Sequence, residues 1–256
     1  MAADAVINHS EDREIDFNIG AFDGKKIWCR LNKAEDGKAT KAVVLSHGLT
    51  GHPNEYIHMM ARNYFTARGY DVYRFAYYND GDDYRTLTDC TLDIHGKDLN
   101  SVIGFVQQSY EKVFVCGHSY GGLTMLFAQP QVAAVSFWDS SFLPYDAFWK
   151  HSAEYVPELN SYALKWECEF KVGKAMVEEA KALTTEKATS MAATFKAPSL
   201  VVLAGDSTEN AGATRLHDSL CCEKALHDVE GADHCFTKGD TVFGLLEETY
   251  NWFERF

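Results

Sequence analysis

Hydrophobic and polar residues recur along this chain with two different periods, which predict alternating strands and helices. Apolar and polar residues alternate over 15–19, and a second strand pattern covers 26–31, after an Asp23-Gly24 turn. Two short strand patterns joined by an Asp-Gly turn are typical of a β-hairpin. We therefore expect the chain to open with a hairpin.

Strand and helix patterns then alternate. The predicted strands cover 41–46, 71–76, 112–116, 132–138, 199–204 and 225–229, and a first helix covers 54–68. Two further sets have the spacing of one buried helix face, namely Leu99, Val102, Ile103 and Val106, and Phe243, Leu246, Tyr250 and Phe253. Such alternation builds a mostly parallel central sheet with helices on both faces. We expect one α/β domain over residues 1–256, a common length for such a domain.

One stretch interrupts the alternation. Residues 140–197 separate two predicted core strands by more than one crossover helix requires. The stretch is rich in aromatic residues: Phe142, Tyr145, Phe148, Trp149, Tyr155, Tyr162, Trp166 and Phe170. We expect a small helical cap, inserted over the edge of the sheet where strands end and active residues gather.

Composition narrows the possible functions. The net charge of −13 argues against binding to nucleic acid or to anionic membranes. No apolar run approaches the roughly 20 residues of a membrane-spanning helix, and the first residues show no secretory signal. The seven cysteines, an odd number, indicate reduced thiols and a cytoplasmic protein. The sequence predicts no oligomeric state.

Neither a nucleotide nor a metal has support in the sequence. No Gly-rich phosphate loop follows a predicted strand, and no group of cysteine and histidine residues has zinc-finger spacing. We therefore expect no cofactor and no bound metal.

The most informative motif is Gly117-His118-Ser119-Tyr120-Gly121, which lies between a predicted buried strand and a helix. A serine on a sharp turn between strand and helix projects its hydroxyl into a cleft. Glycine is needed on both sides, because a Cβ atom there would collide with the neighbouring chain. Ser119 is therefore the candidate nucleophile.

A base and a source of oxyanion donors also follow predicted strands. His234 lies in a loop after the last strand, and its ordinary pKa near 6.5 suits a base that takes the serine proton. His47 and Gly48 follow the strand 41–46 and form a turn whose backbone N–H groups could face a developing oxyanion. We expect His47 to support its own loop through hydrogen bonds.

These residues resemble those of the α/β-hydrolase family, in which serine, acid and histidine occur in this order along nearly the whole chain. The loop around His234 is similar to that of small esterases and acyl-ester hydrolases. The resemblance implies that the backbone N–H groups of Leu49 and Tyr120 form the oxyanion hole. It also implies a carboxylic-ester hydrolase that forms an acyl-enzyme on Ser119. The aromatic residues of 140–197, beside a serine nucleophile, favour a small-molecule substrate with an apolar acyl or alcohol portion. A thioesterase, a C–C bond hydrolase and a non-catalytic binding protein share the same layout.

The acid has three candidates. The family pattern Gly-x-x-Asp, counted from Gly205, ends on Thr208, whereas Asp206 comes two residues early. A short deletion in this turn would make Asp206 the acid, and we favour this interpretation. Asp206 also suits a turn or a helix N-cap without any catalytic role. Glu209 and Asp139 are the alternatives, the latter placed one strand earlier.

Overall fold

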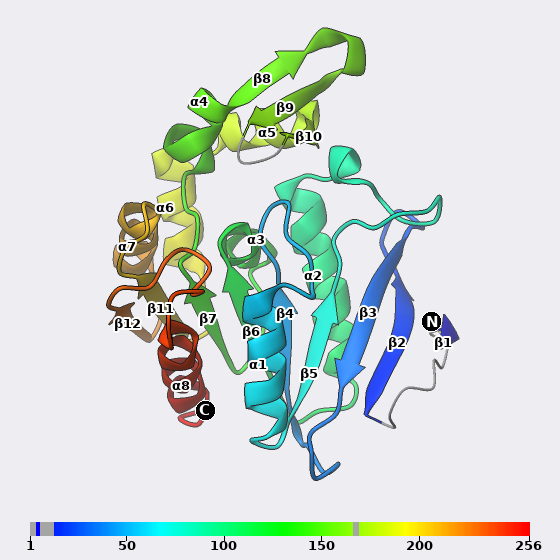
Figure 1. The fold of residues 1–256 in the computed structure, drawn as a ribbon, viewed down its shortest axis with the longest axis vertical. Coiled ribbons are helices and arrows are strands. Elements are labelled where there is room, and N and C mark those ends of the chain that lie inside the picture. Colours follow the sequence, from blue (N-terminus) through cyan, green and yellow to red (C-terminus); the bar gives the residue numbers. More distant parts are fainter. Residues whose placement is uncertain (1–3, 6–12, 166–168) are drawn as a thin grey trace.

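A nine-stranded sheet forms the centre of the protein (Figure 1). The computed structural model describes residues 4–5, 13–165 and 169–256. The strands are β1 (Asp4–Ala5), β2 (Glu14–Gly20), β3 (Lys26–Asn32), β4 (Lys41–Ser46), β5 (Tyr70–Phe75), β6 (Lys112–His118), β7 (Ala134–Trp138), β11 (Ser199–Ala204) and β12 (Lys224–Val229). Their spatial order is β1-β2-β3-β5-β4-β6-β7-β11-β12.

The sheet is antiparallel at one edge and parallel elsewhere. β2 and β3 form the expected hairpin, and β3 pairs antiparallel with β5. From β5 to β12 every neighbouring pair is parallel. The hairpin and the mostly parallel sheet are thus confirmed. The carboxyl ends of all the parallel strands lie together at one end of the sheet. Active residues gather at this end in open sheets of this kind.

Helices cover both faces of this sheet, as expected (Figure 1). One face carries α1 (Tyr56–Thr66) and α8 (Thr241–Phe253), which pack with the sheet in one apolar cluster. The other carries α2 (Leu92–Val106), α3 (Tyr120–Ala128), α6 (Thr185–Thr194) and α7 (Asn210–Ser219). Within the described residues, none of these helices has both the length and the apolar content of a membrane span.

The buried face of α8 differs from the prediction at Phe243 and, to a smaller extent, at Tyr250, which is only partly buried. Phe243 was expected in the core but is 45% exposed, whereas its neighbour Val242 is fully buried. The buried residues of α8 are Val242, Leu245, Leu246, Thr249, Trp252 and Phe253. Val242, Leu245, Leu246 and Thr249 follow the same helical spacing, so Val242 takes the buried position that was predicted for Phe243. For α2, the predicted face is buried as expected.

The segment between β7 and β11 is not purely helical, contrary to the expectation. It holds the π-helical turn η2 (Tyr145–Trp149), α4 (Lys150–Ser152), η3 (Pro157–Leu159) and α5 (Lys174–Ala182) besides α6. It also contains a three-stranded antiparallel sheet of β8 (Ala153–Val156), β9 (Ser161–Lys165) and β10 (Glu169–Gly173). Phe170 and Val172 alternate with polar residues on β10, a pattern that favours a strand. Trp166, one of the predicted aromatics, lies outside the described residues.

This insertion lies above the carboxyl ends of the parallel strands (Figure 1), and two of its contacts reach the start of α2 and the turn before it. The Glu179 carboxylate of α5 accepts hydrogen bonds from the backbone N–H groups of Leu92 and Asp93, the first residues of α2. Gly173 packs so closely on η1 (Leu87–Asp89) that a Cβ atom there would lie 2.0 Å from the Thr88 carbonyl oxygen. The insertion is therefore held against the N-terminus of α2.

Candidate active site

Ser119 occupies a strained turn between β6 and α3. Its φ of 54° and ψ of −120° are rare for a residue with a side chain. A Cβ atom on Gly117 would lie 2.6 Å from the Gly121 oxygen, and one on Gly121 would lie 2.3 Å from the Ser46 oxygen. The prediction that a Cβ atom at either glycine would collide with the neighbouring chain is thus confirmed.

His234 is held by a buried carboxylate, that of Asp139. The His234 Nδ1 atom lies 2.6 Å from Asp139 Oδ2. Because an ionised carboxylate can only accept, Nδ1 carries the proton and Nε2 is left as the basic nitrogen of the neutral ring. Asp139 is fully buried, has a φ of 40° and donates its own backbone N–H to the Val202 oxygen at 2.8 Å. The residue directly after β7 therefore supplies the acid that contacts His234, and β7 lies next to β6, which Ser119 follows.

The expectation that Asp206 orients His234 is wrong. The Asp206 carboxylate pairs with Lys238, 3.0 Å from its Nζ, and its side chain is 54% exposed. The backbone N–H of Asp206 donates to the Ala232 oxygen at 2.9 Å, which fixes the turn after β11 against the loop after β12. An exposed cation thus satisfies Asp206 at the surface, while the partner of His234 comes from β7.

The pKa of His234 is raised above its ordinary value. Burial is the largest single influence and lowers it, because a charged imidazolium is costly in an apolar setting. The hydrogen bond and the charge of Asp139, followed by the charges of Glu209 and Asp233, together outweigh the burial. The site therefore stabilises the protonated ring that forms when His234 accepts a proton.

Glu209, the second candidate acid, lies near His234 without replacing Asp139. Burial raises the pKa of Glu209, and a hydrogen bond with Ser141 opposes that change. Its charge acts on both His234 and Asp139. Among the hydrogen bonds of the described residues, none joins Glu209 to His234.

A cleft of about 430 Å³ brings the predicted residues together. It is lined by Gly48, Leu49, Thr50, Gly51, Glu55, His118, Ser119, Tyr120, Ser141, Phe148, Thr208, Glu209, His234 and Cys235. Ser119, His234, Leu49 and Tyr120 thus share one cavity, from which Asp206 is absent. The insertion contributes Phe148 to its wall.

Both backbone N–H groups expected to hold an oxyanion border Ser119. Tyr120 is the first residue of α3, and the first N–H groups of a helix have no partner within it. Leu49 follows Gly48, at which a Cβ atom would lie 3.3 Å from Ser119 Cβ. The Leu49 turn is therefore packed directly against the serine.

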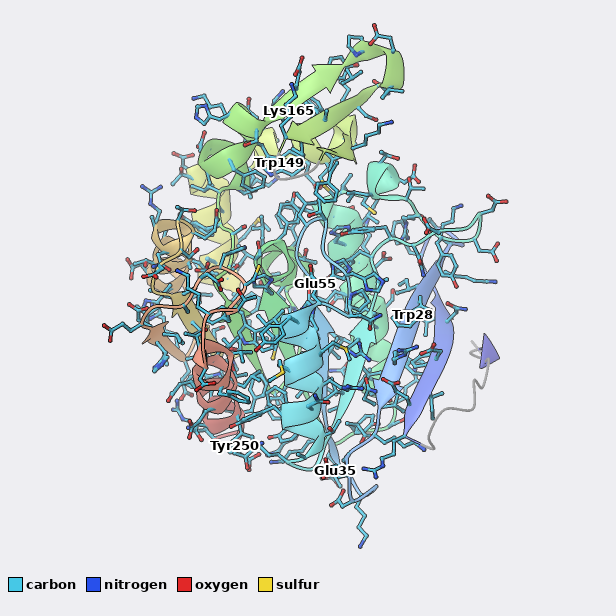
Figure 2. The ribbon with its side chains drawn as sticks, viewed as in Figure 1. Trp28, Glu35, Glu55, Trp149, Lys165 and Tyr250 are labelled. Atoms are coloured by element: carbon cyan, nitrogen blue, oxygen red, sulfur yellow. The ribbon has the colours of Figure 1, made fainter. Side chains whose placement is uncertain are left out.

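The Tyr120 side chain connects this turn to the insertion. Its buried ring lies 6.1 Å from the ring of Trp149, measured between centroids. Figure 2 shows Trp149 where the insertion meets the body of the protein. A shift of the insertion would therefore displace the side chain of Tyr120, the residue that follows Ser119.

Two buried histidines, His47 and His118, hold the loops of the site in place through hydrogen bonds to backbone groups. Nδ1–H of His47 donates to the Gly48 oxygen at 2.8 Å, and its Nε2 accepts the Tyr77 backbone N–H at 3.2 Å. Burial lowers its pKa to about 4, so the ring stays neutral. The predicted structural role of His47 is thus confirmed.

His118 was not singled out from the sequence. Its Nε2–H donates to the backbone oxygen of His234 at 2.8 Å and so ties the histidine loop to the serine turn. Burial lowers its pKa to about 3. Its position inside the Gly-x-Ser-x-Gly motif was the only available signal. Among the described residues, no group of three or more histidine, cysteine or acidic side chains could hold a metal.

The fold and this site agree with a family-level comparison. Residues 43–239 match the model described as "Alpha/beta hydrolase family", so the chain belongs to this family. The resemblance inferred from the sequence and the expected fold are thereby confirmed. No curated protein matches the chain significantly by sequence.

Solved structures of similar shape are esterases and hydrolases of low sequence identity. The esterase domain of a Rhodothermus marinus protein has a TM-score of 0.73 at 19% identity, over 95% of this chain and 98% of its own. Est1E of Butyrivibrio proteoclasticus, with ferulic acid bound, has a TM-score of 0.76 at 17% identity, over 93% and 99%. The dienelactone hydrolase of Anabaena variabilis has a TM-score of 0.66 at 15% identity, over 95% and 99%. At these identities the likeness concerns the fold.

Proposed function

We propose that this protein is a serine hydrolase that cleaves a carboxylic ester through an acyl-enzyme on Ser119. The observation that carries the proposal is the hydrogen bond between His234 and the buried Asp139, at a cleft that Ser119 also lines. A hydroxyl, an imidazole and a carboxylate in one site are the groups that activate a serine. Family membership and the esterases among the similar folds support the same reaction.

The first half-reaction acylates the enzyme. Ser119 Oγ attacks the ester carbonyl carbon while Nε2 of His234 takes the hydroxyl proton, and the carbonyl electron pair moves onto oxygen. When the tetrahedral intermediate collapses, the C–O bond to the alcohol breaks and His234 gives its proton to the departing oxygen. Asp139 stays ionised and stabilises the imidazolium between these two transfers.

The second half-reaction releases the acid. Water attacks the acyl carbon with His234 as base, the bond to Ser119 Oγ breaks, and the proton returns to the serine. In both steps the backbone N–H groups of Leu49 and Tyr120 hold the oxygen that becomes negative. Donors fixed in place by the peptide backbone cost no reorganisation at the moment of reaction.

The insertion over the cleft acts as a lid in this proposal. Phe148 brings an aromatic wall to the cleft, which suits an apolar portion of the substrate. The same Ser119, His234 and Asp139 need no metal or organic cofactor for the chemistry described. The cytoplasmic location inferred from the cysteines stays a prediction, which cell fractionation would test.

A chain-length series of p-nitrophenyl esters tests the function. We expect turnover by the wild-type protein, with the optimal acyl length set by the cleft, and loss of turnover in Ser119→Ala. A folded Ser119→Ala protein that hydrolyses esters at the wild-type rate would exclude Ser119 as nucleophile. Turnover of thioesters in the absence of ester turnover would reassign the substrate while keeping the mechanism.

A further inference from the structure

The acidic residues that line the cleft bear on the charge of the substrate that the cleft accepts. The cleft is lined by two carboxylate side chains, Glu55 and Glu209, and its lining residues within the described chain include no lysine or arginine. Glu55 immediately precedes α1 and Glu209 immediately precedes α7, so they approach from helices on opposite faces of the sheet. Glu55 is labelled near the centre of the molecule in Figure 2.

The surroundings of the two carboxylates lack a lysine or arginine in the described part of the chain. Among the salt bridges of the described residues, none joins Glu55 or Glu209 to a lysine or arginine. The Glu55 carboxylate lies 3.7 Å from Nδ1 of His58, but burial lowers the pKa of His58 well below its ordinary value, so that ring is neutral. Glu209 receives a hydrogen bond from the Ser141 hydroxyl. Two carboxylates therefore face the cleft with no lysine or arginine paired to them among the described residues.

The position of these charges relative to His234 indicates which part of the substrate they meet. Both glutamates line the same cleft as His234. Burial raises the pKa of Glu55 and of Glu209, and the charge of the nearby His234 ring opposes this change in both. In the proposed reaction His234 must reach the oxygen of the departing alcohol to protonate it. Carboxylates grouped around this ring therefore border the alcohol portion of the ester.

From this arrangement we infer that the cleft selects esters whose alcohol portion carries a positive charge, such as an amino or quaternary ammonium alcohol, and disfavours anionic ones. The inference rests on the proposed function and refines its substrate class, since the apolar portion then becomes the acyl group. Opposite charges attract across a short distance in a partly desolvated cleft, and like charges repel. A neighbouring cavity shares Thr208 and Glu209 with the cleft and is also lined by Arg215 and Asp146. Because it carries charges of both signs, we assign the preference for a cation to the cleft and not to this cavity.

A matched pair of substrates isolates the charge. The 2-(trimethylammonio)ethyl and 3,3-dimethylbutyl esters of one acid have the same shape and differ in a single charge. A 3-carboxypropyl ester supplies the opposite sign. We expect wild-type kcat/KM for the cationic ester to exceed that for its neutral counterpart by roughly tenfold or more at low salt, and to fall towards parity at high salt.

Two single variants assign the preference to the carboxylates. In Glu55→Gln and Glu209→Gln the ratio of the two kcat/KM values should fall several-fold, and in the double variant it should approach one. Neither glutamate side chain caps its helix through a hydrogen bond, so glutamine at each position should leave the fold intact. The ratio also separates selection from an effect on His234, because a change at His234 slows both esters equally.

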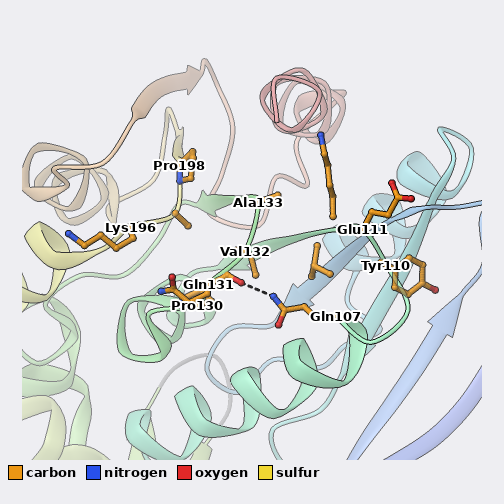
Figure 3. A pocket seen from close by; sticks show the side chains of 12 residues that line it. Gln107, Tyr110, Glu111, Pro130, Gln131, Val132, Ala133, Lys196 and Pro198 are labelled. Atoms are coloured by element: carbon orange, nitrogen blue, oxygen red, sulfur yellow. Dashed lines mark hydrogen bonds between the residues drawn. The ribbon is translucent and has the colours of Figure 1, made fainter.

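Glu111→Gln is the matched control. Glu111 is exposed and lines a cavity at the amino ends of β6 and β7, the opposite edge of the sheet from Ser119 (Figure 3). This variant removes the same charge and should leave the ratio unchanged. The inference would be overturned if the wild-type ratio were one, or if neither cleft variant changed the ratio. Turnover of the esters would in that case still support the proposed function. Absence of turnover for every ester would remove both.

Discussion

Asp139 and His234 are 95 residues apart in the sequence, yet their side chains are joined by a hydrogen bond of 2.6 Å. Asp139 directly follows β7 and His234 lies in the loop after β12, and β11 lies between these two strands in the sheet. The left-handed backbone at Asp139, with its φ of 40°, turns the chain at this point. The relationship fixes which ring nitrogen of His234 is free to act as a base.

Asp139→Asn should lower kcat by ~10³–10⁴-fold, because an amide cannot hold the imidazole in the required tautomer or stabilise the imidazolium. Asp206→Asn is the matched control, since it makes the same change in a carboxylate that pairs with Lys238 at the surface. We expect its kcat to stay within a few-fold of the wild type. Ester kinetics on both purified proteins compares them directly, and the reverse order of effects would restore Asp206 as the acid.

Protonation of His234 should set the acid limit of activity. The raised pKa predicts that kcat/KM rises with pH through a midpoint above 6.5, because the base must be unprotonated to act. Loss of the negative charge in Asp139→Asn should move this pKa downward. NMR titration of the His234 ring in both proteins measures the shift, and an unchanged pKa would show that Asp139 does not govern the ring.

The two glycines of the serine turn should not tolerate a methyl group. Gly117→Ala and Gly121→Ala place Cβ within 2.6 Å and 2.3 Å of backbone oxygens, so we expect a loss of at least ~1–3 kcal/mol in the free energy of unfolding. Gly104→Ala is the contrasting control. Nothing lies within 4 Å of its added Cβ in the last turn of α2, and the variant should gain up to about 0.5–1 kcal/mol. Denaturant unfolding of the three variants tests this order.

The contact between the insertion and α2 should depend on Glu179. Glu179→Gln weakens the acceptor of two N–H groups at the start of α2, which we expect to cost about 0.5–2 kcal/mol in unfolding free energy. The insertion should also become more sensitive to limited proteolysis. The neighbouring Glu178→Gln, which loses an exposed pair with Lys181, should change both quantities little. Equal behaviour of the two variants would contradict the proposed attachment.

The sequence predicted most of the sheet and the residues of the serine turn, because both depend on local patterns. Apolar runs mark β4 and β11 at their observed bounds, and the glycines around Ser119 mark the turn by steric necessity. The acid could not be chosen in this way. Whether Asp139 or Asp206 meets His234 depends on strand order, on a left-handed residue and on Lys238, none of which is visible in local spacing.

The insertion shows the same limit. Its length and aromatic content indicated an additional layer, but β8, β9 and β10 are short strands. Their pairing depends on contacts between segments such as Tyr162 and Val172, which lie opposite each other in the register. A short segment of mixed composition does not reveal such a partner by itself.

Labelling with a fluorophosphonate probe, followed by peptide mapping, tests the central claim most directly. The probe reacts only with a serine made nucleophilic by its surroundings, so we predict one added phosphonate on Ser119 and a sharp loss of labelling rate in Asp139→Asn. Prior unfolding of the protein should abolish the reaction. A folded wild-type protein that remains unlabelled, or that is labelled elsewhere, would contradict the assignment of Ser119 as an activated nucleophile.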